Sequence, residues 1–204
     1  MIQKLYESGN RPQDLDRIAA LLSDGALVVY PTDTLYAIGC LALSVRAVER
    51  ICRLKGIDPK KNNLSILCRD LSQAAEYARI DNVAFRLMKR NLPGPFTFIL
   101  PASSKLPSIF RYRKEVGIRI PATPVLNELL SHLDTPLLSM SIPLRPDYED
   151  PAYRTDPQLI HELWEEQVDL VIDGGIAPGE PSTIVRCTEG FPEIVRQGPT
   201  RLQD

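Results

Sequence analysis

The sequence predicts an α/β protein built on one mixed parallel and antiparallel sheet with flanking helices. Along most of the chain, short β-branched or aromatic runs alternate with amphipathic helical patterns, an order typical of α/β folds. The last three apolar runs, at residues 168–173, 182–187 and 193–196, follow one another without a helix between them. The chain has 204 residues, of which 44% are hydrophobic, so one domain over residues 1–204 can bury a substantial core.

The predicted helices are recognised by their apolar stripes and by their start and stop signals. Leu15, Ile18 and Leu22 lie on one face of a helix at residues 12–24, with Pro12 early in it and Gly25 just past its end. Similar capping residues, prolines or glycines mark helices at 44–54, 123–133 and 156–167. Two shorter helices are expected after Leu71 and over 81–91.

The first predicted strand covers residues 26–31, and Pro31 ends it. Strand-helix-strand units favour parallel pairing and short loops favour antiparallel pairing, so we expect a mixed sheet. Residues 145–154 form one long polar connection, which is either a mobile flap or a plain surface loop. The further strands before the C-terminal three are expected at 64–68, 96–100, 116–120 and 136–141.

Composition and absent motifs exclude several classes of protein. The formal net charge is −2, so any binding of nucleic acid would need a local basic patch. The sequence contains no signal-peptide pattern and no apolar run near the ~20 residues of a membrane span, and we expect a cytoplasmic protein that does not bind membranes. It also lacks the P-loop, GxGxxG, HExxH and GxSxG patterns.

The four cysteines and two histidines predict neither a structural zinc site nor a disulfide framework. The cysteines have no CxxC spacing, and only two histidines could join them as metal ligands. Reduced and mostly buried thiols are the expected state. The cysteines are Cys40, Cys52, Cys68 and Cys187.

The first candidate site follows the strand at residues 26–31. Ligands in open α/β sheets bind where loops leave strand ends, so the polar side chains after Pro31 are candidates. In the alternative interpretation this is an ordinary loop whose hydroxyl groups bond to their own backbone. The candidate residues are Thr32, Asp33, Thr34 and Tyr36.

Isolated basic residues would have to hold any nucleotide, because the usual phosphate-binding loops are absent. Lys55 lies at a predicted helix C-terminus, where the helix dipole alone also favours a cation. Arg119 alternates with apolar residues on a predicted strand and therefore needs either an acidic partner or an anionic ligand. Arg196, near the C-terminus, is either a ligand for an anion or a solvated side chain.

Residues 28–40, VVYPTDTLYAIGC, resemble the PT(E/D)TVYGLG signature of the YrdC/YciO family of threonylcarbamoyl-AMP synthase-like proteins. The resemblance continues in family order through LKGIDPKKNNLSIL, PGPFTFIL, VGIRIP, LLSMS and STIV, and spans about residues 15–198. It implies the YrdC/RibB-like fold, a single open and twisted mixed sheet with a concave face. The pattern looks closer to the YciO branch than to the main YrdC branch.

The resemblance also implies a set of residues that bind substrate and nucleotide, with no catalytic side chain and no protein ligand for a metal. In this set the basic residues neutralise phosphates, and the hydroxyl groups orient the amino acid and the nucleotide. The set consists of Thr32, Thr34, Lys55, Arg119, Ser141, Ser182 and Arg196.

The activity implied by the resemblance is a nucleotidyl transfer. L-threonine, bicarbonate and ATP, with Mg²⁺, would give threonylcarbamoyl-AMP and pyrophosphate for modification of a tRNA adenosine. Three positions depart from the family pattern: Ile57 replaces the arginine of KGRP, Pro143 replaces the asparagine of STSAN, and Cys68 stands where many relatives have histidine. Isoleucine cannot hold an anion and proline lacks a backbone N–H, so we expect weak or redirected activity. Arg53, or Lys60 and Lys61, would be the replacement cations.

The sequence leaves two alternative functions open, each from a different class of protein. One is a protein that binds double-stranded RNA or tRNA without chemistry, and the other is a nucleotide sensor. A steep dependence of RNA affinity on salt, without ATP turnover, would favour the first.

Overall fold

A computed structural model describes residues 1–62, 64–112, 114–143 and 151–203 of the chain. The strands are β1 (Ile2–Lys4), β2 (Val28–Tyr30), β3 (Ala37–Leu41), β4 (Ser65–Leu67), β5 (Phe96–Pro101), β6 (Glu115–Arg119), β7 (Leu137–Ser141), β8 (Leu170–Asp173), β9 (Thr183–Arg186) and β10 (Glu193–Arg196). The helices are α1 (Pro12–Ser23), α2 (Val45–Lys55), α3 (Leu71–Tyr77), α4 (Asn82–Asn91), α5 (Ser108–Arg111), α6 (Pro124–Ser131) and α7 (Pro157–Trp164), with a 3-10 helix η1 (Pro151–Arg154).

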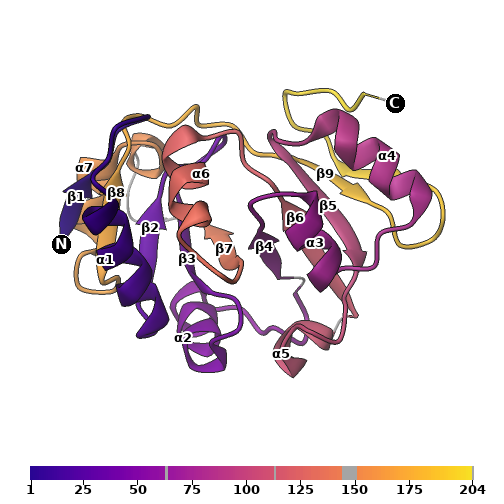
Figure 1. Ribbon diagram of the computed structural model, residues 1–204, viewed down its shortest axis with the longest axis horizontal. Coiled ribbons are helices and arrows are strands. Elements are labelled where there is room, and N and C mark those ends of the chain that lie inside the picture. Colours follow the sequence, from indigo (N-terminus) through magenta and orange to yellow (C-terminus); the bar gives the residue numbers. More distant parts are fainter. Residues whose placement is uncertain (63, 113, 144–150, 204) are drawn as a thin grey trace.

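The strands form one ten-stranded sheet in the order β1-β8-β2-β3-β7-β4-β6-β5-β9-β10, which runs across the molecule in Figure 1. Pairing is parallel for β1/β8, β2/β8, β4/β6 and β5/β9, and antiparallel for β2/β3, β3/β7, β4/β7, β5/β6 and β9/β10. The predicted mixed α/β sheet with flanking helices is therefore confirmed.

The predicted neighbours within the sheet were partly wrong. β7 lies between β3 and β4, and β6 lies between β4 and β5, so strands joined by a helix are separated by a strand from elsewhere in the chain. Parallel pairs arise instead between strands far apart in sequence. Of the three C-terminal strands, β9 and β10 pair antiparallel as expected, whereas β8 lies between β1 and β2.

Four short elements were not predicted: β1, β3, α5 and η1. No strand was predicted at residues 37–41, but they form β3 and pair with β2 through Val29 and Ile38. Gly39 in this strand packs directly on Tyr30, since a Cβ at position 39 would lie 2.2 Å from the tyrosine hydroxyl oxygen. Residues 145–150 of the predicted long connection lie outside the described residues, and its last four residues form η1.

The sheet carries apolar residues on both faces, which explains the uninterrupted run of apolar residues before Pro31. Val28 and Tyr30 belong to the core cluster under α1 and α6, whereas Leu27 and Val29 belong to a larger cluster on the other face. Alternate residues of a strand point to opposite faces, so one strand serves both clusters. All four cysteines are free and buried, as expected.

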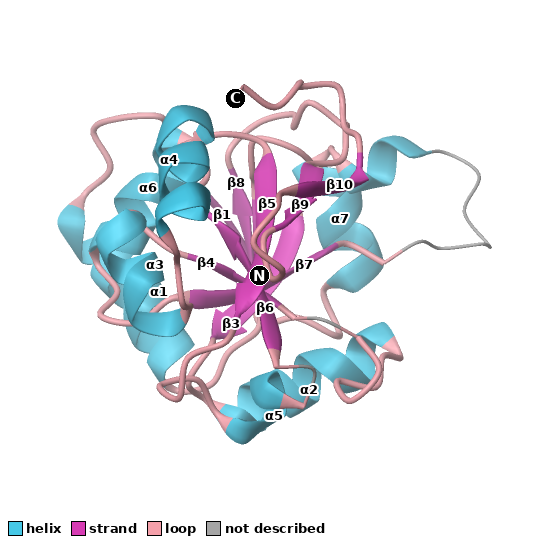
Figure 2. Ribbon diagram, turned by 90° about the vertical axis from the view of Figure 1, so that its right-hand side faces the viewer, coloured by secondary structure: helices cyan, strands magenta, loops and turns pink. Residues whose placement is uncertain are grey.

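Figure 2 shows the helices around the sheet, with α1, α3, α4 and α6 on one side, α7 on the opposite side, and α2 and α5 below. None of the helices in the described ranges is both long and apolar enough to span a membrane.

Candidate functional site

A cavity of about 280 Å³ lies over the middle of the sheet, between its strands and the segment that follows α2. It draws lining residues from β7, β4, β6, β5, β9 and β10, which are consecutive in the sheet. Side chains that alternate with these lining residues, among them Leu138, Ile66, Ile118 and Phe98, belong to the larger apolar cluster. Apart from Met140, the strand residues that line the cavity therefore lie on the face opposite the larger cluster.

Small residues form the floor of the cavity. Ser65 of β4 is the register partner of both Ser139 of β7 and Gly117 of β6, so these three residues form a row across the sheet. A Cβ at Gly117 would lie 2.2 Å from the Ser65 hydroxyl oxygen and 3.2 Å from the Thr97 methyl carbon. The missing side chain at position 117 leaves room for the two neighbouring hydroxyl side chains.

Three cations from distant parts of the chain line this cavity: Lys55, Arg119 and Arg196. The lining also contains the hydroxyl groups of Ser65, Thr97, Ser139, Ser141 and Ser182, and among the described residues it contains no aspartate or glutamate. A concave site with positive charge and hydroxyl donors favours an anionic ligand, because each charge-assisted hydrogen bond is stronger than a neutral one.

Lys55 lies at the C-terminal end of α2, where Gly56 in the left-handed conformation ends the helix. Its Nζ donates a hydrogen bond to the backbone oxygen of Ser141, so the ammonium group is held at the end of β7. Burial lowers the pKa of Lys55, and the positive charge of Arg154 lowers it further. Both causes disfavour the charged lysine, and the negative charge of an anion beside it would counteract their effect on the pKa.

Arg119 is 8% exposed, and its guanidinium group is held by the loop between β2 and β3. Its Nη2 lies 2.7 Å from Asp33 Oδ1 and donates a second hydrogen bond, of 3.1 Å, to Thr34 Oγ1. The other oxygen of Asp33 accepts a hydrogen bond of 3.0 Å from the backbone N–H of Ala122. Arg119 thus has the acidic partner that its sequence position requires, and it also lines the cavity.

Arg196 lies on β10 and binds the residue that precedes β9. Its Nε and Nη2 donate to the backbone oxygen of Ser182 at 3.1 and 2.9 Å, and Nη2 also donates to Ser182 Oγ at 3.1 Å. Gly198 permits this approach, because a Cβ there would lie 2.6 Å from the backbone oxygen of Pro181. Burial lowers the pKa of Arg196 and the nearby charge of Arg119 lowers it further, so the two guanidinium groups repel each other across the cavity.

The predicted residues of the loop after β2 are not among the described residues that line the cavity. Thr32 Oγ1 donates to the backbone oxygen of Leu35 and contacts Thr34 Oγ1 at 2.7 Å, so it is bound within its own loop. Thr34 accepts from Arg119. The hydroxyl of Tyr36 donates to the Gly175 carbonyl and accepts from the Gly174 N–H, at 2.8 and 3.1 Å. Thr34 thus supports Arg119 and Thr32 supports Thr34, whereas Tyr36 attaches the start of β3 to residues 174 and 175.

Of the seven predicted binding residues, the structure brings five to one cavity: Lys55, Arg119, Ser141, Ser182 and Arg196. Ser182 is buried and its hydroxyl also contacts Thr97 Oγ1 at 2.9 Å. The sequence did not single out Ser65, Thr97 and Ser139 as site residues. The signal that could have identified them is a small polar residue within an otherwise apolar strand.

The structure also shows where the three residues that depart from the family pattern lie. Ile57 lines the cavity, whereas the Pro143 carbonyl accepts a hydrogen bond of 3.2 Å from the Tyr153 hydroxyl. Cys68 is buried in the larger core cluster, and burial raises the pKa of its thiol. The three expected replacement cations, Arg53, Lys60 and Lys61, are exposed and are not among the cavity lining that the structure describes.

The described residues do not offer a site for a resident magnesium ion. They contain no group of three or more histidine, cysteine, aspartate or glutamate side chains placed to hold a metal. Asp33 is the carboxylate bound to a cavity residue, and both of its oxygens are engaged. A Mg²⁺ ion that enters this cavity would have to be held mainly by the phosphates of its ligand and by water.

Comparison with known proteins finds relatives that all belong to one family. Residues 20–198 match the model of the Sua5/YciO/YrdC family, which carries the description "Telomere recombination". The chain is 40% identical over 202 residues to the uncharacterized protein YciO of Escherichia coli, an alignment that covers 97% of this chain and 96% of that protein. It is 32% identical to the threonylcarbamoyl-AMP synthase of Pyrococcus abyssi, with 92% of this chain and 55% of that protein covered.

Solved structures agree with these matches. The crystal structure of E. coli YciO superposes with a TM-score of 0.90 at 35% identity and covers 100% of this chain and 98% of that one. The structure of P. abyssi Sua5 complexed with L-threonine superposes with a TM-score of 0.84 at 28% identity and covers 97% of this chain and 57% of that one. The sequence, the sheet topology and these matches together place the chain in the Sua5/YciO/YrdC family.

Proposed function

We propose that the protein joins L-threonine, bicarbonate and ATP into threonylcarbamoyl-AMP and pyrophosphate, at a low rate. The observation that carries the proposal is the convergence of Lys55, Arg119 and Arg196 on one cavity that is lined by hydroxyl groups. ATP is a polyanion, and such a site neutralises its phosphates in a partly desolvated environment. The support for threonine is the P. abyssi Sua5 structure, whose protein was crystallised with L-threonine.

In this proposal the protein acts by positioning and by neutralising charge. Lys55 and Arg196 bind the phosphate chain, and Arg119, held by Asp33, binds the carboxylate of threonine or the adjacent phosphate. Ser141 and Ser182 orient the two substrates. The threonine amine condenses with bicarbonate to a carbamate with loss of water. A carbamate oxygen then attacks the α-phosphorus of ATP, and pyrophosphate leaves as that P–O bond breaks. Magnesium enters as the counter-ion of ATP.

The proposed low rate follows from the two departures. Ile57 brings an aliphatic side chain into the cavity at the position of a family arginine, and Pro143 removes an amide side chain and a backbone N–H. The product would serve tRNA modification, as in a threonylcarbamoyl-AMP synthase.

A pyrophosphate-release assay tests the proposal. Release should require ATP, threonine and bicarbonate together, and it should fall strongly in Lys55→Ala. Arg53→Ala is the matched control, because Arg53 lies two residues away on α2 but is exposed to solvent. Release without threonine, or release unchanged in Lys55→Ala, would contradict the proposal.

A further inference from the structure

We propose that Arg154 is a further ligand-binding residue of this cavity and that it clamps the phosphate chain of the ligand together with Lys55. The inference rests on the proposed function, because it assumes a polyphosphate ligand. Arg154 ends η1, a segment far from Lys55 in sequence.

Two backbone hydrogen bonds place Arg154 near the end of β7, whose last residue, Ser141, lines the cavity. The Tyr36 N–H donates to the carbonyl of Arg154 at 3.2 Å, and the Ile142 N–H donates to the carbonyl of Tyr36 at 3.1 Å. Arg154 therefore continues the hydrogen-bonded ladder just past the end of β7. Ser141, the last residue of β7, accepts the hydrogen bond of Lys55 with its backbone oxygen. Lys55 and Arg154 thus approach the end of the same strand from different elements.

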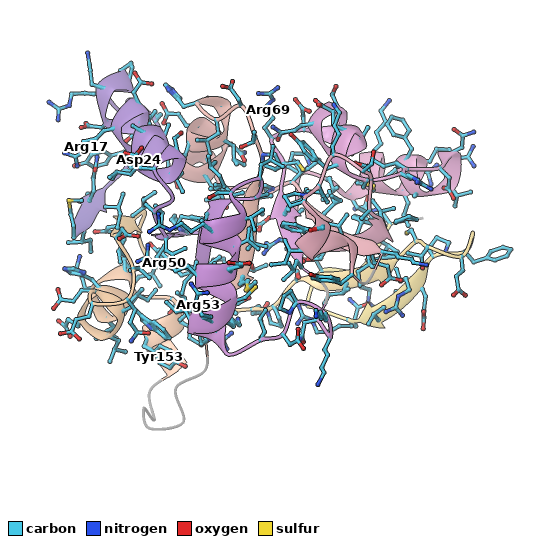
Figure 3. All side chains as sticks on the ribbon, turned by 90° about the horizontal axis from the view of Figure 1, so that it is seen from below. Arg17, Asp24, Arg50, Arg53, Arg69 and Tyr153 are labelled. Carbon is cyan, nitrogen blue, oxygen red and sulfur yellow. The ribbon has the colours of Figure 1, made fainter. Side chains whose placement is uncertain are left out.

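The side chain of Tyr153 fixes η1 at this place. Its hydroxyl donates to the carbonyl of Pro143, two residues after Ser141. In Figure 3, Tyr153 lies near the end of α2 that carries Arg53, which is the end where Lys55 is located. The charge of Arg154 is close enough to lower the pKa of Lys55.

Within the described residues, the guanidinium group of Arg154 forms no ion pair. Its Nε is buried, and the Nε–H group has no hydrogen-bond acceptor in the described part of the chain. The ion pairs between described residues do not include Arg154, whereas Arg119 of the same site is paired with Asp33. A partly buried cation facing a second cation is unfavourable, and an anion placed between the two relieves both the repulsion and the lost hydration.

Charge counting indicates the class of ligand. With Arg154, the site has four cations, because Lys55, Arg119 and Arg196 already line the cavity. The single carboxylate bound to these cations is that of Asp33, so the local excess is about three positive charges at neutral pH. A triphosphate chain matches this excess better than a single phosphate or an amino-acid carboxylate. Arg154 would also add a cation next to Lys55, whereas Arg53, Lys60 and Lys61 are exposed and are not among the described residues that line the cavity.

The test measures the binding of inorganic tripolyphosphate by calorimetry to the unmodified protein, Arg154→Gln, Arg154→Ala and Arg53→Ala. Arg154→Gln removes the charge but keeps a polar side chain, so weaker binding by this variant cannot be attributed to lost packing around η1. Both changes at Arg154 should weaken binding by about tenfold to a hundredfold, the range for a charge-assisted hydrogen bond, and Arg53→Ala should leave it within about twofold.

A second measurement follows Lys55 without any ligand. The pH dependence of its acetylation, read by mass spectrometry, gives its pKa, which should rise in Arg154→Gln and stay constant in Arg53→Ala. Tripolyphosphate affinity unchanged in both Arg154 variants would overturn this inference and leave the proposed function standing. An unmodified protein that binds neither tripolyphosphate nor ATP would overturn both.

Discussion

At the scale of the single residue, Lys55 has both a structural role and a role in the proposed site. It ends α2, bonds to the last residue of β7 and faces the cavity. Because burial and Arg154 disfavour its charged form, its pKa in the folded, ligand-free protein is lower than in the unfolded chain. The ligand-free fold is therefore destabilised at pH values below the lowered pKa, where Lys55 is charged in both states. This destabilisation shrinks as the pH rises above the lowered pKa, and it is gone above the ordinary lysine value.

Binding of ATP should reverse this shift. An anion next to Lys55 favours its proton, so we expect proton uptake on binding in the window between the lowered pKa and the ordinary lysine value of about 10.4. Calorimetry in two buffers of different ionisation enthalpy measures the uptake. Lys55→Arg serves as the control, because arginine stays charged over the whole window and should show none. Equal uptake in both proteins would contradict the assignment of Lys55.

The pair of Arg119 and Asp33 predicts a separable effect on binding and stability. Arg119→Ala should weaken ATP binding by about 1.5 to 3 kcal/mol, and it should also destabilise the fold because it leaves Asp33 buried and unpaired. Arg119→Met with Asp33→Asn removes both charges and should recover much of the lost stability. Affinity restored along with stability in the double variant would show that Arg119 acts only as a structural ion pair.

At the scale of elements, the hairpin of β2 and β3 positions the loop that holds Arg119. Gly39 is essential to it, because a Cβ would lie 2.2 Å from the hydroxyl oxygen of buried Tyr30 and 2.6 Å from a ring carbon. We expect Gly39→Ala to lower the free energy of unfolding by about 1 to 3 kcal/mol, as overpacking does. Adding Tyr30→Phe should recover part of the loss, since the nearest atom is removed. Unfolding in urea measures both, and an unchanged midpoint for Gly39→Ala would contradict this packing.

Local signals decided which elements the sequence could predict. Pro12 and Gly25 bracket α1, whose observed bounds agree closely with the predicted ones. β3 was missed because its five residues become a strand through pairing with β2 and β7, which are contacts that the local pattern does not contain. The insertion of β7 between β3 and β4 is likewise a long-range choice.

The same distinction holds for the site. Arg119 could be identified because a charge within an apolar strand requires a partner, but its bond to Asp33 joins segments that only the fold brings together. Ser65 and Ser139 could not be distinguished from ordinary strand residues until the register placed them side by side. Arg154 carried no signal in the sequence at all, since its position depends on η1 lying beside the end of β7.

At the scale of the whole molecule, the departures at positions 57 and 143 should set the rate. Two missing polar contacts, each contributing about 1 to 3 kcal/mol in the transition state, lower turnover by roughly two to four powers of ten. Ile57→Arg with Pro143→Asn should raise the rate of pyrophosphate release by more than the two single changes combined, because both positions serve one ligand. Turnover of the unmodified protein equal to that of a relative with both motifs would contradict this reasoning.

The most direct test of the central claim is a crystal structure of the protein grown with ATP and L-threonine. We predict that the phosphate chain lies within hydrogen-bond distance of Lys55 and Arg196, above the floor of Ser65 and Gly117, with threonine beside Arg119. Nucleotide bound elsewhere, for example in the groove between Arg46 and Arg50, with the cavity free of phosphate, would contradict the account.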